Sequence, residues 1–387
     1  MASFGALSDG QKISRRHLLL AVATLPAGVD AASKASIANA NVEAVFPGFQ
    51  QALDLYRELE GTPGHQPAWR KRLTIAAQAS LTGDEAKSIQ ARLQLLRDMP
   101  AEADSPGALA AGLASFQERH GLKKTGAADT ATIRELEVSP FDRSQQLSAN
   151  LAKAQKLLRT LGEKLVLVNI PEFKLYAYRK FRAMYQPSLE MRVVVGKRDR
   201  QTPPIVSRIE EVELNPYWNV PRKIAVQELA DRLKDPTYFA ERGFQYVATS
   251  SDGRISVSKR QSEDAWGRYL ARETKLRQGP GKWNALGRFK FSFNNDDDIF
   301  LHDTLQTSGF SATNRSLSHG CVRLQNPGEL ASFVLPNTSL AEVNDRVERG
   351  DYLAYRLDKQ DWPTLIITSL TAFPRAGQVH FRRDPYL

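Results

Sequence analysis

Nucleophilic catalysis by a thiol is the chemistry that the residue types of this chain favour most. The 387 residues include one cysteine, Cys321, which lies in the segment SHGCVR at 318–323, and His302 precedes it by nineteen positions. A thiol with a pKa of about 8.5 is only slightly ionised at neutral pH, so attack on a carbonyl needs an imidazole that takes up the proton. Two of the six histidines lie this close to the cysteine, and either His302 or His319 is a candidate base.

The backbone around Cys321 also suits acyl transfer. If residues 318–322 are extended, His319 and Cys321 share a face, and His302 reaches the thiol from a neighbouring strand. Gly320 lets the chain come close to a substrate carbonyl, so the N–H groups of Gly320 and Cys321 are candidate oxyanion donors. A lone cysteine is more often a small buried hydrophobic residue, but the two histidines and the glycine favour catalysis here.

A zinc site is the rival to thiol chemistry. A catalytic zinc needs three protein ligands, and His302, His319 and Cys321 are a possible set. A single cysteine excludes an intrachain disulfide and any cluster of several cysteines around a metal. The chain has no Gly-rich phosphate loop, so neither a nucleotide nor a metal cofactor is expected.

The elements expected to position these residues are mainly strands. Alternation of apolar and polar residues predicts strands at 165–169, 175–178, 191–195, 289–293 and 299–302. In the last of these, the alternation places His302 on the side opposite Leu301. Val226, Leu229 and Leu233 lie at helical spacing, which predicts a helical insertion at about residues 222–275.

The residues before 162 have the period of helices instead. Apolar side chains recur every three or four positions, and Asp129 is the expected N-cap of a short helix that ends near Leu136. We expect a helical N-terminal segment at 41–83, a small helical module at 84–138, a connecting helix at 139–162 and a catalytic domain at 163–387.

The first forty residues have the order of an export signal. Basic residues precede an apolar run at 18–29, and small residues at 38–40 suit a signal peptidase. The segment SRRHLL at 14–19 resembles the twin-arginine signal. The apolar run is far short of the ~20 residues that cross a bilayer, so no stable span is expected once residues 1–40 are removed. The alternative is an N-terminus that is only a fraying amphipathic segment.

The charge favours an anionic environment. The chain has 53 basic and 43 acidic residues, for a net charge of +10. Charge alone does not choose among nucleic acid, a membrane surface and an acidic polymer.

The residues around the cysteine resemble the active-site signature of the L,D-transpeptidases, the YkuD-like catalytic domain. The signature consists of His302 and, seventeen positions later, the histidine of SHGCVR. Three flanking segments are similar to the large periplasmic branch of that family: NPYWNVP at 215–221, GPGKWNALG at 279–287 and LHDT at 301–304. The resemblance covers roughly residues 163–356, half of the chain.

The resemblance implies an α+β protein whose catalytic domain is mainly a β sandwich with a helical insertion, preceded by a small helical module. It implies that Cys321 attacks the third residue of a peptidoglycan tetrapeptide stem, releases D-alanine and forms a thioester. An amine of a second stem then resolves the thioester and gives a 3→3 crosslink. In the family pattern His302 is the base and the backbone at Asp303 orients it, while His319, Gly320 and the Cys321 amide line the oxyanion pocket.

Further residues are candidates for substrate binding. They are Arg323, Ser318, Asp303, Trp218 and Asn284. Arg323 is as consistent with a structural ion pair as with a substrate carboxylate, and Trp218 as consistent with a core position as with a cleft wall. Phe300 stands where several relatives have tyrosine, so no hydroxyl is available there. The loop that contains Phe310 and Arg315 is expected to be a lid.

A second resemblance concerns residues 84–138, which are similar to the small three-helix peptidoglycan-binding module. The segments IQARL at 89–93 and FQERHGL at 116–122 carry it, with Asp129. Residues 100–107 replace the usual glycine-aromatic turn. The module is equally consistent with a spacer.

The sequence thus predicts an exported cysteine transpeptidase of the periplasm and cell wall, with roles in peptidoglycan biosynthesis and cell shape, and a target of carbapenems. Its expected partners are the donor tetrapeptide and the acceptor amine, with no nucleic acid. The alternatives are an L,D-carboxypeptidase, attachment or release of a wall protein by the same thioester chemistry, and a non-enzymatic peptidoglycan-binding protein.

Overall fold

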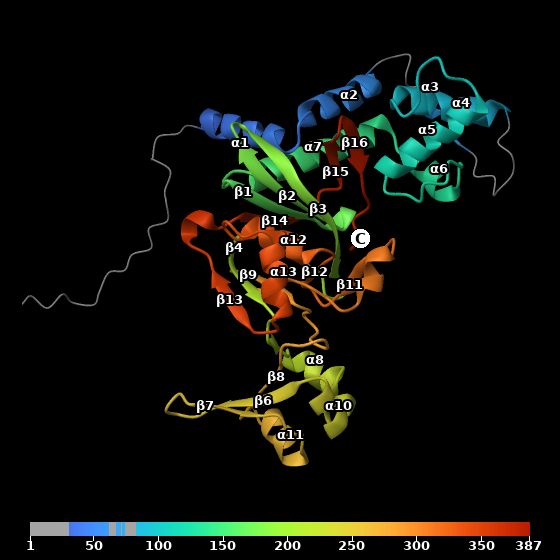
Figure 1. Ribbon diagram of the computed structural model, residues 1–387. Coiled ribbons are helices and arrows are strands. Elements are labelled where there is room, and N and C mark those ends of the chain that lie inside the picture. Colours follow the sequence, from blue (N-terminus) through green and yellow to red (C-terminus); the bar gives the residue numbers. More distant parts are fainter. Residues whose placement is uncertain (1–30, 62–66, 71, 74–82) are drawn as a thin grey trace, which may run out of the picture.

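The computed structural model describes residues 31–61, 67–70, 72–73 and 83–387 (Figure 1). Most of the expected export signal, residues 1–30, lies outside them. The expected cleavage segment at 38–40 lies within α1 (Ala31–Val45), and just after it Asn41 Nδ2 donates a hydrogen bond to Leu158 O at 2.7 Å. Processing of residues 1–40 therefore stays a prediction.

The N-terminal third is helical, as the apolar periodicity predicts. Asp129 is the N-cap of α6, and its side chain accepts from Thr132 N at 2.9 Å, which confirms the expected helix start. Ser105 and Ser139 cap α5 and α7 in the same way, each followed by a proline at the first helical position. The helices after α1 are α2 (Phe49–Gly61), α3 (Pro67–Arg70), α4 (Gly83–Leu95), α5 (Pro106–Arg119), α6 (Thr130–Leu136) and α7 (Pro140–Leu157).

The catalytic half is built on a ten-stranded sheet that closes on itself. The strand order is β11-β3-β12-β10-β9-β4-β14-β1-β2, β13 pairs with β4, and β2 also pairs with β3. Its strands are β1 (Lys164–Asn169), β2 (Lys174–Phe181), β3 (Met184–Gly196), β4 (Ile205–Leu214), β9 (Phe289–Phe293), β10 (Leu301–His302), β11 (Ser316–Ser318), β12 (Val322–Leu324), β13 (Leu353–Arg356) and β14 (Thr364–Thr368).

Two layers of this sheet enclose the main core, so the expected sandwich-like α+β fold is confirmed. Strand β3 serves both layers, because residues 184–192 pair with β2 whereas 193–194 pair with β12. Phe289, Phe291 and Phe293 point into the core, as their alternation predicts. Helices α12 (Pro327–Val334) and α13 (Leu340–Glu348) also contribute to this core.

The outer face of β1 and β2 packs on helices α1, α2 and α7, with the C-terminal hairpin of β15 (Ala372–Arg375) and β16 (Gln378–Phe381). The hairpin also contacts α5 (Figure 1). The helical third is thereby packed on the catalytic half.

The insertion is a small subdomain with its own apolar core. It contains the predicted helices, but also a four-stranded sheet in the order β5-β8-β6-β7, so the expectation of a purely helical insertion is incomplete. The strands were missed because each has only a short run of alternating residues, such as ISVS in β7. Its elements are β5 (Trp218–Asn219), α8 (Arg222–Gln227), α9 (Ala230–Leu233), α10 (Pro236–Glu241), β6 (Phe244–Thr249), β7 (Ile255–Ser258), α11 (Glu263–Leu270) and β8 (Lys275–Gln278).

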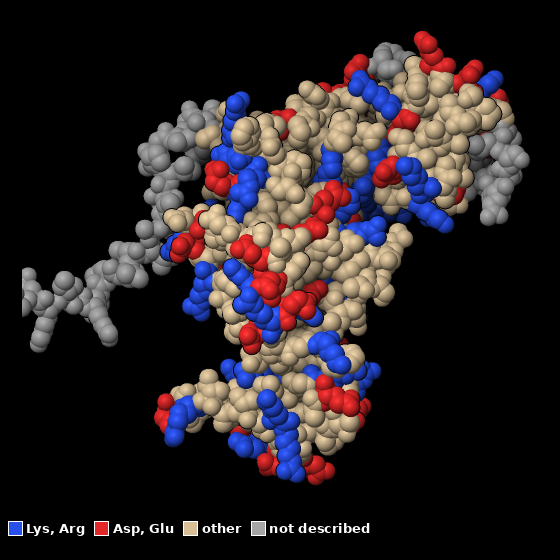
Figure 2. All heavy atoms as spheres, in the orientation of Figure 1, with Lys and Arg blue, Asp and Glu red and all other residues tan. Residues whose placement is uncertain are grey.

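The visible surface mixes both signs of charge. Lys and Arg side chains lie among Asp and Glu side chains over the helical third, the catalytic half and the insertion (Figure 2). Among the described helices, none is long and apolar enough to cross a bilayer.

Candidate active site

The pairing of β10 with β12 brings the two predicted catalytic residues to one face. The strands are parallel and in register, with Leu301 opposite Val322 and His302 opposite Arg323. Leu301 and Val322 are fully buried in the core, so His302 and Arg323 project from the other face. Cys321 directly precedes β12, and alternation puts it on the same face as His302. This confirms the expectation that His302 lies opposite Leu301 and on a strand next to the cysteine.

The thiol of Cys321 is partly buried and its hydrogen bonding is weak. Its Sγ lies 3.7 Å from the carbonyl oxygen of Asp298. Burial raises the pKa of Cys321 to about 11, although the Phe300 backbone and the cations of Lys290 and Arg323 oppose the shift. At neutral pH the sulfur therefore carries its proton, and attack on a carbonyl requires a base.

His302 can be that base, because its ring is neutral. Burial, and then the cation of Arg323, lower the pKa of His302 to about 3. Backbone hydrogen bonds of the ring with Asp303 and Leu286 oppose this shift, although the buried Nδ1 itself has no partner of ordinary hydrogen-bond geometry within the described residues. The ring stands edge-on to Phe300, with centroids 5.5 Å apart. The site thus contains a neutral thiol and a neutral imidazole, not a preformed ion pair.

Two cations flank the imidazole on the sheet. Lys290 of β9 is opposite His302, and its ammonium pairs with the carboxylate of Glu213 on β4. On the other side, Arg323 donates from one guanidinium nitrogen to Gln306 Oε1 at 3.1 Å, while its buried Nε has no partner among the described residues. This arrangement favours a substrate group that carries negative charge.

The turn at 318–321 is built around Gly320. Its φ of +123° lies in a region that L side chains rarely adopt, and Ile299 Cδ1 would be 3.1 Å from an added Cβ. Gly320 N–H donates to Ser318 Oγ at 3.2 Å, and Ser318 Oγ–H donates to Cys321 O at 2.6 Å. Both groups are therefore used within the turn. We correct two expectations: in this structure Gly320 N–H is not free as an oxyanion donor, and Ser318 does not face a substrate.

The remaining oxyanion candidate is the amide of Cys321. Cys321 N–H has no backbone or side-chain partner among the described residues, so it is available to a substrate oxygen.

His319 is bonded to a carboxylate of the insertion. β11 ends at Ser318, so the extended segment that would put His319 and Cys321 on one face is absent. His319 Nε2 lies instead 2.9 and 3.0 Å from the two carboxylate oxygens of Glu228, in the insertion. The condition under which His319 and Cys321 would share a face is therefore not met, because the turn at Gly320 redirects the chain.

The sequence analysis missed two residues that hold this turn. Thr202 Oγ1 donates to Gly320 O at 2.6 Å and accepts from Gly196 N at 2.9 Å. Thr202 N–H in turn donates to the hydroxyl of Tyr386, near the C-terminus, at 3.0 Å. No local pattern marks either residue, because the contacts that join Thr202 to Gly320 and to Tyr386 span more than one hundred positions.

Asp303 and Asn284 are structural in this arrangement. Asp303 accepts from Arg288 N and Thr304 N, at 2.8 and 2.7 Å, which fixes the chain after His302. Asn284 is 1% exposed and bonds Pro216 O, Gly279 O and Leu286 N. Neither carries its polar atoms toward Cys321, so substrate contact by these two residues is not supported.

Similarity to known proteins agrees with this geometry. Residues 163–348 match the L,D-transpeptidase catalytic domain family, YkuD. This region of the chain is therefore similar to L,D-transpeptidase catalytic domains. It contains the complete turn at 318–321 and both strands that carry the candidate base and nucleophile.

A relative and two solved structures are also similar. A protein of Haemophilus influenzae, provisionally named an L,D-transpeptidase, is 32% identical over 207 residues, which are 53% of this chain and 40% of that protein. The chain thus spans two fifths of the relative it matches. An L,D-transpeptidase from Mycobacterium smegmatis has 11% identity and a TM-score of 0.27, over 54% of this chain and 59% of that chain. L,D-transpeptidase 1 of Mycobacterium tuberculosis has 12% identity and a TM-score of 0.23, over 54% of this chain and 62% of that chain. Both structures are too distant to support a structural argument.

The remaining aromatic and loop candidates, Trp218, Phe310 and Arg315, are anchored. Trp218 packs against the apolar core of the insertion. Phe310 is buried and its carbonyl accepts from Arg192, while Arg315 donates to the carbonyls of Glu172 and Phe173. The loop between the two histidines is therefore tied to the sheet, and the expectation of a lid finds no support in these contacts.

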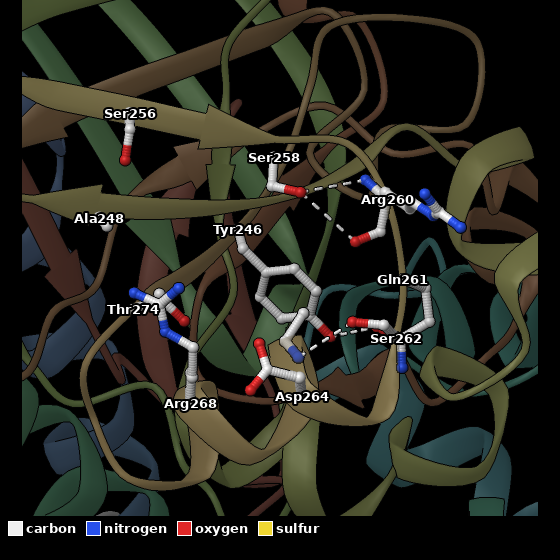
Figure 3. Close-up of a pocket in the computed structure, with 11 residues that line it drawn as sticks. Tyr246, Ala248, Ser256, Ser258, Arg260, Gln261, Ser262, Asp264, Arg268 and Thr274 are labelled. Carbon is white, nitrogen blue, oxygen red and sulfur yellow. Dashed lines mark hydrogen bonds between the residues drawn. The ribbon is translucent and has the colours of Figure 1, made fainter.

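A polar pocket lies apart from this site, in the insertion. It has a volume of about 350 Å³ and lies between β6, β7 and α11 (Figure 3). Tyr246 donates to Gln261 on its wall, and Arg260, Asp264 and Arg268 give it mixed charge. Neither Cys321 nor His302 lines it.

The rival metal site does not form among the described residues. No three side chains from His, Cys, Asp and Glu in the described ranges are grouped so that they could hold a metal ion. His319, which the His₂Cys set requires, bonds to Glu228 instead.

Proposed function

We propose that this chain is a peptidoglycan L,D-transpeptidase that forms 3→3 crosslinks through a thioester on Cys321. The proposal is supported above all by the position of Cys321 and His302 on one face of adjacent strands, within a domain that matches the family. Export through the N-terminal signal, and action in the periplasm or cell wall, belong to the same proposal.

The first half-reaction passes one proton from the thiol through His302 to the leaving amine. His302, neutral because of its low pKa, takes the thiol proton as Sγ of Cys321 attacks the carbonyl of the third residue of a donor tetrapeptide. The oxygen that becomes negative is stabilised by Cys321 N–H and by the nearby cations Lys290 and Arg323. Collapse breaks the amide bond, and His302 returns the proton to the departing amine of D-alanine. The product is the thioester.

The second half-reaction reverses these roles. The side-chain amine of an acceptor stem attacks the thioester, His302 removes a proton from it, and the thiol regains a proton as it leaves. If water attacks instead, the outcome is an L,D-carboxypeptidase, and if the amine belongs to a wall protein, that protein is attached. The domain itself does not distinguish these acceptors.

Product analysis tests the proposal directly. The full chain is incubated with purified disaccharide-tetrapeptide, and the products are measured by mass. A dimer that has lost one D-alanine supports transpeptidation, a tripeptide supports hydrolysis, and unchanged substrate counts against both.

Covalent labelling separates an enzyme from a non-enzymatic wall-binding protein. Incubation with a carbapenem is expected to add one adduct per chain, and Cys321→Ala is expected to abolish it. Because Cys321 is the one cysteine of the sequence, a thiol-specific reagent serves as the matched control for accessibility. A chain that reacts with the reagent but never with the carbapenem would contradict the transpeptidase proposal.

For residues 84–138 we propose peptidoglycan binding. Helices α4, α5 and α6 fall within the expected module, which supports the assignment. Co-sedimentation of the full chain with insoluble peptidoglycan, with Cys321→Ala to prevent covalent capture, tests it. Retention in the soluble fraction would favour the spacer alternative.

A further inference from the structure

We propose that Glu228, a residue of the insertion, is a positioning residue for the active-site turn and acts through His319. The inference rests on the proposed function, because its main measurement is acylation of Cys321. The inference assigns the insertion a part in the reaction. The insertion supplies the carboxylate that fixes His319, the residue two positions before Cys321.

The geometry of the contact is specific. Glu228 directly follows α8, and its own N–H closes that helix by donating to Ile224 O. Its two carboxylate oxygens lie 3.0 and 2.9 Å from Nε2 of His319. Arg200, from the loop between β3 and β4, donates to Oε1 at 2.8 Å. Three segments that are far apart in the sequence therefore meet at one carboxylate.

The carboxylate is held in its charged form. Partial burial alone would raise the pKa of Glu228, but the hydrogen bonds and charges of Arg200 and His319 outweigh it and hold that pKa below its usual range. An ionised carboxylate can only accept hydrogen bonds, so it requires a proton on the nitrogen that faces it.

This fixes the tautomer of His319. Its Nε2 carries a proton whether the ring is neutral or charged, so Nε2 does not accept the proton of the thiol. The carboxylate also sets the ring orientation, as acidic partners of functional histidines commonly do. His302 remains the residue that is free to act as base.

The turn is then clamped from two sides. From the sheet, Lys197 N–H donates to Ser318 O at 3.0 Å and Thr202 holds Gly320 O. From the insertion, Glu228 holds His319, and among the described residues no other hydrogen bond joins the insertion to residues 318–321. Gly320, whose φ of +123° makes the turn, lies between His319 and Cys321. The direction of the Cys321 amide, the oxyanion candidate, therefore depends on both clamps.

The expected effect of losing the contact is on the chemical step. Glu228→Ala should reduce the rate constant of carbapenem acylation by roughly 10- to 100-fold, the scale at which a displaced group slows a reaction. Glu228→Gln keeps one acceptor oxygen and should recover part of the rate. The matched control is Glu273→Ala, which removes an exposed ion pair with Arg268 in the same insertion and should acylate as the wild type does.

A double-mutant cycle tests whether Glu228 acts through His319. In a His319→Gln background, Glu228→Ala should produce no further loss, because the ring that it orients is gone. Additive losses, or a Glu228→Ala variant that acylates like the wild type, would overturn the inference.

A spectroscopic measurement separates this inference from the proposed function. In ¹⁵N NMR of the full chain, the ring of His319 should show the Nε2–H tautomer, and Glu228→Ala should abolish that preference. If the wild type is never acylated, the proposed function fails, but the tautomer measurement still shows whether Glu228 orients the ring of His319. If the wild type is acylated and the tautomer does not change, the inference fails by itself.

Discussion

Two arginine–histidine pairs among the described residues, one fully buried and one with a half-buried arginine, are used differently. Arg119 and His120 lie where α5 meets the C-terminal hairpin. Arg119 forms a two-pronged ion pair with Asp98 and donates to Val379 O. His120 Nδ1 bonds Phe116 O at 2.7 Å, and its ring is stacked between Phe116 and Phe381.

The second pair, His302 and Arg323, differs in that polar atoms of both side chains lack hydrogen-bond partners within the described ranges. The two residues lie opposite each other on β10 and β12, yet His302 Nδ1 and Arg323 Nε are buried without a partner among the described residues. Burial lowers the pKa of His120 as it does that of His302, so burial alone does not distinguish them. The difference lies in the hydrogen bonds. Polar groups that have hydrogen-bond partners within the protein stabilise the fold, whereas polar groups without such partners are available to a substrate.

The largest expected effect that tests this comparison is catalytic. His302→Gln removes the base, so the acylation rate of Cys321 should fall by roughly 10²- to 10⁴-fold. The matched variant His120→Gln should acylate at the wild-type rate in its folded fraction. Stopped-flow or mass-based acylation rates measure both. Similar rates for the two variants would remove the distinction between the pairs.

The second-largest expected effect is on the stability of the fold and concerns Arg119 and His120. Asp98→Ala leaves Arg119 as an unpaired buried cation, so the free energy of unfolding should fall by about 3 to 5 kcal/mol. The control Asp345→Ala breaks an exposed pair with Arg349, and should change it by less than about 1 kcal/mol. Denaturant titration measures both variants, and an Asp98→Ala chain as stable as its control would contradict the assignment.

Acid should destabilise both regions. The folded-state pKa values of His120 and His302 lie below the ordinary value of about 6.5, so below that pH the unfolded chain binds protons that the folded chain does not. Stability is therefore lost as pH falls from about 6.5 toward the folded values; for His302 the loss is about 2 kcal/mol between pH 7 and pH 5, and for His120 it has the same sign. Thermal or denaturant unfolding at the two pH values should show a smaller loss in His302→Gln and in His120→Gln.

Arg323→Gln should affect substrate binding more than folding. Loss of a charged hydrogen-bond donor facing a substrate carboxylate costs about 1.5 kcal/mol, a roughly tenfold rise in KM. Arg356→Gln, which breaks an exposed pair with Glu211, is the control. An unchanged KM with reduced stability would instead assign Arg323 to a structural role.

The smallest expected effect concerns the pH dependence of the rate. Because the pKa of His302 is about 3 and that of Cys321 about 11, the reactive pair of neutral groups persists between these values. The pH profile of kcat/KM should therefore be flat through pH 6.5. An inflection there would indicate that the free enzyme uses a histidine with an ordinary pKa.

Local features were predictable from the sequence because they depend on neighbours in the chain. The cap at Asp129, the alternation of Phe289, Phe291 and Phe293, and the position of His302 opposite Leu301 follow from the periods of helices and strands. The insertion was less predictable, because its strands are short and β7 is exposed along its whole length. Alternation that buries no side chain gives a weak signal.

The sequence by itself determined the candidate nucleophile, since the one cysteine directly follows a histidine and a glycine that permits an unusual backbone. It did not determine what each histidine does. That was decided by the tertiary structure, because the direction of a side chain depends on backbone dihedrals at residues such as Gly320 and on partners from distant segments. Pairing of β10 with β12 places His302 beside the thiol, whereas Glu228, 91 positions away, accepts the hydrogen bond of His319.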